Sequence, residues 1–255
     1  MKNASDYSNY YNPYDFDMDI NGLPTFSKKN IDLISTFVKN DSNYRVPENA
    51  NSESYSKLFL DNKFPENKDD LEKAVRLIDK ENSTHLAVKD SINMTVNKII
   101  EMGLENVKNR IKDGDPTVVN EITKANPHRM NFSFASKFCT YCNRYCFNKD
   151  DYSIYDSIVA KILPYYSYVY SDQICWKTSS RKNSRTVSST ICDEYAKTPN
   201  YKGYNELIGR ILNEVKSNVN ADITRKDIDL LLWYYFKGPE DRIEKAYKYL
   251  KGIQN

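Results

Sequence analysis

Glycine and histidine are scarce in this chain, with 7 and 2 copies among 255 residues. Glycine-rich loops let the backbone approach phosphate closely, so their scarcity argues against nucleotide-binding loops of the P-loop or dinucleotide type. Two histidines are also too few to favour a Ser-His-Asp triad or a histidine-based metal site. We therefore expect neither a metal ion nor a cofactor.

Long apolar runs are missing as well. No run approaches the roughly 18 residues that a membrane span requires, and charged residues make up 28% of the chain. The N-terminus lacks a basic region followed by an apolar core, so we expect no secretory signal. These absences predict a cytoplasmic protein with no membrane partner, and we expect it to be a monomer.

Cysteine occurs five times, an odd number that favours free thiols in an unsecreted chain. The spacing of Cys139, Cys142 and Cys146 suggests a metal site. On one face of a helix, however, they would span about 10 Å, which is too far for a single ion. An iron-sulfur cluster needs four thiolates with loop-like spacing. We interpret the three cysteines as small core residues.

Apolar residues recur at three- and four-residue spacing along much of the chain, which predicts a mainly α protein without convincing strands. The predicted helices cover residues 31–38, 68–79, 89–112, 116–122, 201–215, 224–236 and 239–253. Two further helices are predicted to start at residue 133 and directly after residue 156. We expect residues 1–66 to form an N-terminal arm and irregular segment. Residues 67–255 would form one helical domain.

A lysine and an aspartate, Lys137 and Asp156, each lie in an apolar helical pattern. An amine can attack carbon only when it is unprotonated, and apolar neighbours and a helix N-terminus would both lower the pKa of Lys137. A carboxylate in an apolar stretch normally has a partner. Asp156 would either assist the amine or cap the following helix, because aspartate is a preferred N-cap residue.

Three short segments resemble the helix-hairpin-helix DNA glycosylases, most of all the 8-oxoguanine branch. Bacterial proteins of 8-oxoguanine DNA glycosylase fold carry a Ser-Phe-Ala-Ser-Lys stretch, an Ile-Tyr-Asp-Ser stretch and a C-terminal Asp-x-x-Leu-Trp. Here these stand at residues 133–137, 154–157 and 229–233. The resemblance extends over roughly residues 120–250, and it implies a glycosylase-like helical bundle.

The resemblance also implies a chemistry and a partner. Lys137 would attack the sugar C1′ of a flipped nucleotide in DNA, expel a modified or damaged base and form a Schiff base that can lead on to strand scission. Asp156 would orient the sugar and stabilise the oxocarbenium-like charge. Base excision repair and anti-phage defence both remain open as the biological role.

A flipped base must be held by aromatic or apolar side chains while polar groups read its edge. The sequence offers many aromatic residues for such a pocket, including 21 tyrosines. Each candidate could equally belong to an aromatic core. The candidates for the base pocket are Tyr141, Tyr155, Trp176, Tyr204, Trp233 and Tyr234, together with Asp229.

The chain departs from the family at the glycine-rich hairpin whose backbone amides bind a DNA phosphate. Residues 126–131 stand there without a glycine. Other groups would then have to contact the phosphates. The candidates are His128, Arg129, Ser133 and Ser136 near the hairpin, and Arg181, Lys182 and Arg185 in a hydroxyl-rich segment that holds no anion.

Two rival functions remain open at this point. A helical module that binds DNA or a protein without catalysis would make Lys137 and Asp156 structural, and the missing glycine hairpin favours it. A different Schiff-base or hydrolytic enzyme is the second. The net charge of +2 is compatible with a nucleic-acid partner but does not decide among these.

Overall fold

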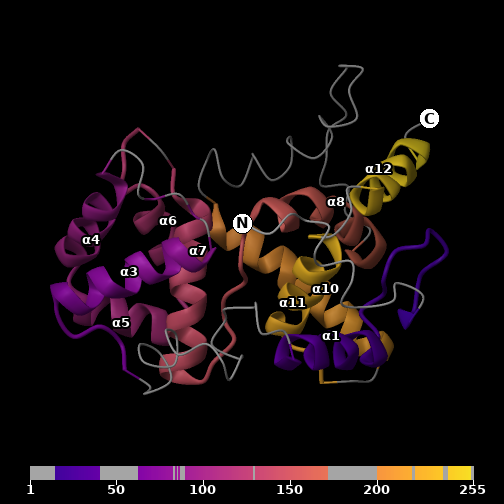
Figure 1. Ribbon diagram of the computed structural model, residues 1–255, viewed down its shortest axis with the longest axis horizontal. Coiled ribbons are helices and arrows are strands. Elements are labelled where there is room, and N and C mark those ends of the chain that lie inside the picture. The colour runs from indigo at the N-terminus through magenta and orange to yellow at the C-terminus, as the bar shows by residue number, and fades with distance from the viewer. Residues whose placement is uncertain are drawn as a thin grey trace. The chain divides into compact units, whose positions relative to one another are not determined.

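The computed structural model describes residues 15–40, 63–82, 84, 86, 90–128, 130–171, 200–219, 222–237 and 241–253 (Figure 1). Within these ranges the protein has ten α-helices, one π-helix and no sheet. A single bridge between Met18 and Pro24 is the β pairing found there. The prediction of a mainly α protein is therefore confirmed, and no helix in the described part is long and apolar enough to cross a membrane.

The helices follow the predicted order along the chain. They are α1 (Lys28–Asn40), α3 (Lys68–Asn82), α4 (Ser91–Met102), α5 (Leu104–Lys112), α6 (Thr117–Thr123), α7 (Phe132–Tyr141), the π-helix η5 (Cys142–Cys146), α8 (Ser157–Ser171), α10 (Tyr201–Val219), α11 (Arg225–Phe236) and α12 (Asp241–Ile253). Side chains cap several N-termini. Thr224 and Asp227 form a capping box at α11, and Asp115 Oδ1 accepts a hydrogen bond from the Thr117 N–H, 2.8 Å away, at α6.

The prediction of one continuous helix over residues 89–112 is wrong. Gly103 interrupts it with a φ of 82°, a conformation that glycine adopts without the steric cost of a Cβ atom. Its N–H bonds to the Ile100 carbonyl and ends α4, and α5 starts at the next residue. The apolar spacing continues across the break, because Val96, Ile99, Val107 and Ile111 are all buried. Periodicity alone therefore did not locate the break.

The chain divides into two compact units. Unit 1 contains the described residues of 1–38, 156–195 and 206–255, and unit 2 those of 39–155 and 196–205. The division runs between Tyr155 and Asp156, and also falls within α10. The predicted domain boundary at residue 66 stays a prediction.

Unit 2 is built around α7. This helix packs against α6 and α3, and α4 packs against α3 and α5 (Figure 1). Every residue of α7 except Ser133 is buried, which explains why the segment is rich in aromatic and small residues. Phe134 and Phe138 stack in its core with ring centroids 6.0 Å apart, and Phe64 meets Phe138 edge-on. Burial of this apolar surface is the main stabilising term of the unit.

The extended residues 151–155 of unit 2, here called the lead-in segment, lack the regular main-chain pairing of a helix or sheet. Side chains replace it. Asn143 Oδ1 accepts from the Asp151 N–H at 2.9 Å, and the Tyr204 hydroxyl donates to the Ile154 carbonyl. The Tyr201 hydroxyl accepts from the Ser153 N–H at 2.8 Å and donates to the Ser153 carbonyl at 2.7 Å. Buried backbone polar groups are thereby satisfied.

Unit 1 is organised around α8, which packs against α11 and α12. The described N-terminal residues cover this helix group with large apolar side chains. Phe26 packs against Tyr166 of α8, with ring centroids 4.8 Å apart, and Phe16 contacts Tyr235 of α11 edge-on at 5.2 Å. The Tyr166 hydroxyl also donates to the Pro24 carbonyl at 2.7 Å. Phe16, Leu23 and Phe26 are therefore part of the core of unit 1.

Replacement of Tyr201 by phenylalanine tests the lead-in segment. The ring would stay in place, but the buried N–H and carbonyl of Ser153 would lose their hydrogen bonds with the Tyr201 hydroxyl, which costs about 1–3 kcal/mol in the free energy of unfolding. Chemical denaturation would measure this. Tyr249→Phe is the matched control, since the Tyr249 hydroxyl has no hydrogen bond in the described part of the chain. Equal stability of the two variants would contradict the prediction.

Candidate active site

Lys137 is the sixth residue of α7, which places it in the second turn, and the sequence predicted the first or the second turn. Its side chain is only 5% exposed, which is uncommon for lysine. The ammonium donates to the Ser133 hydroxyl, with Nζ and Oγ 2.9 Å apart. This contact follows from helix geometry, because residues four apart share a face. The sequence therefore contained a signal for Ser133 as the partner of Lys137.

Ser136, the neighbour of Lys137, joins α7 to the lead-in segment. Its hydroxyl oxygen accepts from the Tyr155 N–H at 3.0 Å and also lies 3.3 Å from the Tyr155 carbonyl. Ser136 is fully buried. These bonds fix the peptide that precedes Asp156 along the chain. The contact of Ser136 with DNA stays a prediction. The burial of Ser136 does not favour it, because a buried hydroxyl is not accessible to a DNA phosphate.

Asp156 caps α8. Its Oδ1 accepts hydrogen bonds from the N–H groups of Ile158 and Val159, at 2.9 and 2.8 Å. The capping role predicted for this aspartate is thus confirmed, and the side chain is largely buried. Asp156 belongs to unit 1 and Lys137 to unit 2.

Three predicted pocket residues lie in the aromatic core of unit 2. Tyr155 packs edge-on against Phe132 and Tyr204, with ring centroids 4.7 and 5.4 Å away. Tyr141 is buried and donates to the Asn82 side-chain oxygen at 2.9 Å. A base-binding role for these residues stays a prediction.

The other described pocket residues lie on α11 in unit 1. Asp229 and Tyr234 are buried, whereas Trp233 is half-buried. The Lys237 ammonium lies 3.7 Å from the centroid of the Trp233 ring, a cation–π distance. One face of the Trp233 ring is therefore covered by the Lys237 ammonium.

Only some of the predicted DNA contacts fall on described residues. His128 is exposed, and its N–H donates to the Asn126 side chain at 2.8 Å. Ser133 is partly exposed at the start of α7. The remaining candidates for DNA contact lie outside the described residues: they are Arg129, Arg181, Lys182 and Arg185. The pocket candidate Trp176 also lies outside them.

The three cysteines near the site are free thiols buried in unit 2. Cys139 lies two residues after Lys137 in α7, and Cys142 and Cys146 are the first and last residues of η5. Burial raises the pKa of the Cys139 thiol, and burial together with the nearby Cys146 raises that of Cys142 well above its ordinary value. Thiols that resist ionisation are poor nucleophiles and poor metal ligands.

Sequence reasoning missed the hydroxyl groups that hold the lead-in segment. Tyr201 and Tyr204 lie three residues apart on α10 and both reach this segment. Their spacing on one helix face was visible in the sequence, but their partners are about fifty positions away. Asn143 was missed as well, because a π-helix has no simple sequence signature.

Comparison with known proteins identifies one similarity. The family model HI_0787_N, described as an N-terminal domain, matches residues 29–149. The match covers 121 of the 255 residues, less than half of the chain. It contains Lys137 and ends before Asp156. No curated protein and no solved structure matches the chain.

Two substitutions of Asp156 separate its cap from any other role. Asp156→Ala removes the acceptor for both N–H groups, and the free energy of unfolding should fall by about 1 kcal/mol. Asp156→Asn keeps a side-chain oxygen at the cap and should lose less. Thermal or urea denaturation of the three proteins gives the comparison. Equal losses in both variants would show that the charge, and not the hydrogen bonds, stabilises α8.

Burial also predicts the reactivity of the cysteines. Cys139 and Cys142 should resist iodoacetamide at pH 8 in the folded protein and react fully in denaturant, because their raised pKa values and burial suppress the thiolate. Peptide mapping by mass spectrometry would locate the label. Modification of either residue at the same rate in the folded and the denatured protein would refute this prediction.

Proposed function

We propose that this chain is a DNA glycosylase that excises a modified or damaged base, with Lys137 as the nucleophile and Asp156 as its assistant. The observation that carries the proposal is the burial of Lys137 within a segment that matches the family resemblance. Burial of a charged amine costs free energy. A lysine whose only role is to add charge to the surface would therefore remain exposed. Unusual burial of an ionisable group is typical of functional sites.

In the proposed reaction the neutral Lys137 amine attacks the sugar C1′. The glycosidic bond breaks, and its electron pair leaves with the base, which takes up a proton. Loss of a proton from the amine and opening of the sugar ring then give a Schiff base between Nζ and C1′. The hydrogen bond between Lys137 and the Ser133 hydroxyl orients the amine, and the Schiff base allows abasic-site lyase activity.

Asp156 would stabilise the positive charge that develops on the sugar. Its Oδ1 is engaged by the two N–H groups of α8. No hydrogen bond to Oδ2 is present among the described residues. One oxygen would thus fix the carboxylate while the other faces the sugar. Within unit 2, hydrogen bonds between Ser136 and Tyr155 fix the residue next to Lys137 in the chain.

The test is borohydride trapping on duplex and single-stranded oligonucleotides that carry 8-oxoguanine, uracil, alkylated, hydroxymethylated or glucosylated bases. Borohydride reduces a Schiff base to a stable covalent adduct. We expect an adduct with one of these substrates and its loss in Lys137→Gln. Lys124→Gln, which changes an exposed lysine of unit 2, is the matched control and should trap normally.

Asp156→Asn gives a second, independent variant in case Lys137→Gln does not fold. Because the asparagine keeps the α8 cap, this variant should remain folded while base release falls by about 10²-fold or more. Abasic product would be measured by alkaline cleavage of the oligonucleotide. DNA binding without adduct or abasic product on every substrate would instead favour the non-catalytic DNA-binding module.

A further inference from the structure

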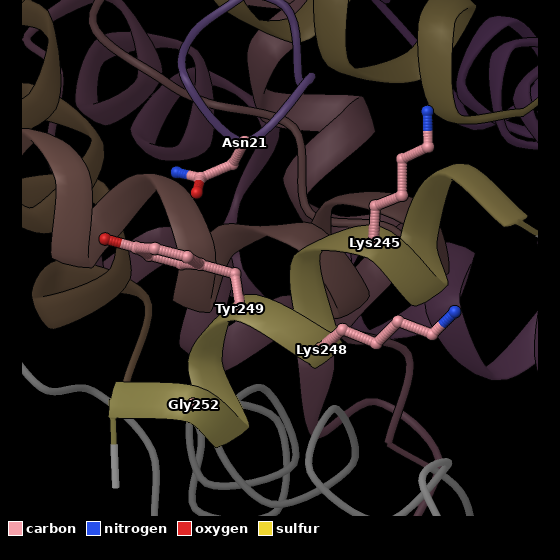
Figure 2. A pocket seen from close by; sticks show the side chains of 5 residues that line it. All are labelled: Asn21, Lys245, Lys248, Tyr249 and Gly252. Carbon is pink, nitrogen blue, oxygen red and sulfur yellow. The ribbon is translucent and has the colours of Figure 1, made fainter.

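Unit 1 contains a surface hollow of about 550 Å³ lined by Asn21, Lys245, Lys248, Tyr249 and Gly252. This volume is within the range of about 300–1,000 Å³ that is typical of small-molecule sites. Figure 2 shows the Asn21 amide and the Tyr249 hydroxyl on one side of the hollow and the two lysine ammonium groups on the other. The hollow thus has a neutral polar side and a cationic side.

Asn21 is held in a defined orientation. Its amide nitrogen donates to the Tyr165 hydroxyl at 3.0 Å, and that hydroxyl donates in turn to the Asp19 carboxylate. Asp19 Oδ1 also accepts from the N–H groups of Asn21 and Leu23, at 2.9 and 3.0 Å. The turn around Asn21 is therefore fixed before any ligand arrives, and the amide oxygen remains as an acceptor.

Tyr249 supplies an aromatic surface that is also fixed. Its ring contacts Tyr165 edge-on at 5.6 Å and lies 6.2 Å from Tyr168. A ring that neighbouring rings already hold loses little conformational entropy when a flat ligand stacks on it. The hydroxyl of Tyr249 has no hydrogen bond within the described ranges, so it can donate to such a ligand.

The cationic side comes from one face of α12. Lys245 and Lys248 are three residues apart, hence neighbours on the helix surface, and both are exposed. Gly252 lies one turn further on, and a Cβ atom built there would meet nothing within 4 Å. The glycine therefore leaves open the space that a side chain would occupy.

We propose that this hollow binds a nucleotide, with the base against Tyr249, its edge toward Asn21 and its phosphate between Lys245 and Lys248. Each part of the lining matches one part of that ligand: aromatic rings stack on bases, amide groups read base edges, and lysines pair with phosphate. Inorganic phosphate would use only the cations. The bound nucleotide comes either from solution or from a single strand of nucleic acid.

The inference does not rest on base excision, because none of the five residues is assigned to the proposed chemistry. Isothermal titration calorimetry of the full chain tests it with nucleoside monophosphates, the matching nucleosides, inorganic phosphate and a short single-stranded oligonucleotide. Binding of mononucleotides identifies the free ligand as the source. Binding of the oligonucleotide alone identifies a strand as the source when Gly252→Phe weakens that binding.

Gly252→Phe should fill the hollow and weaken nucleotide binding by about tenfold or more, equivalent to ~1.4 kcal/mol. Gly252→Ala is the matched control and should bind normally, because helix α12 accommodates alanine and the hollow stays open. The double variant Lys245→Gln, Lys248→Gln should bind nucleotides more weakly than the wild-type chain and bind nucleosides equally well. Lys137→Gln should bind normally, which separates this site from the proposed catalysis.

Three results would overturn the proposal. The first is an absence of binding by every ligand in the wild-type chain. The second is equal binding by Gly252→Phe and Gly252→Ala when circular dichroism shows both to be folded. The third is equal affinity for inorganic phosphate and nucleotides, since the aromatic ring and the amide would then contribute nothing.

Discussion

The structure of unit 2 depends on how the lead-in segment satisfies its backbone. These five residues lie between η5 and α8 in the chain and have no regular secondary structure. Their polar groups are bonded by Asn143, Tyr201, Tyr204 and Ser136. An unpaired buried group costs about 1–3 kcal/mol, so the segment is stable only while all these side chains are in place.

The same requirement gives a reason for the abundance of tyrosine. A buried tyrosine contributes the apolar surface of phenylalanine and a hydroxyl that can reach a distant carbonyl. The fully buried tyrosines use that hydroxyl as a donor in both units. Their acceptors are main-chain carbonyls or, in one case, a carboxylate: Tyr152 donates to Asp115, Tyr165 to Asp19, Tyr166 to Pro24, Tyr201 to Ser153 and Tyr204 to Ile154. These tyrosines are thus core residues, and, except at Tyr165, their hydroxyl groups bond main-chain carbonyls that no sheet pairs in the described part of the chain.

Local signals in the sequence predicted the helices and the cap at Asp156, since apolar periodicity and capping depend on residues close along the chain. They also placed Lys137 near the start of its helix. The break at Gly103 was missed because the apolar stripe continues through it. The hydroxyl network was missed for a different reason. Tyr201 and Ser153 are 48 positions apart, and nothing local in the sequence indicates which hydroxyl will meet which carbonyl.

The π-helix explains how α7 and the lead-in segment are joined. A π turn contains one more residue than an α turn and often occurs at functional sites. Asn143 lies within η5, and its amide donates to the Ile111 carbonyl at 2.9 Å and to the Asp151 carboxylate at 3.0 Å. The C-terminal end of the Lys137 helix is therefore tied to α5 and to the start of the lead-in segment. Ser136 ties the middle of that helix to the end of the segment. With both ends of the segment bonded to α7 and η5, the segment cannot shift within unit 2 without breaking buried hydrogen bonds.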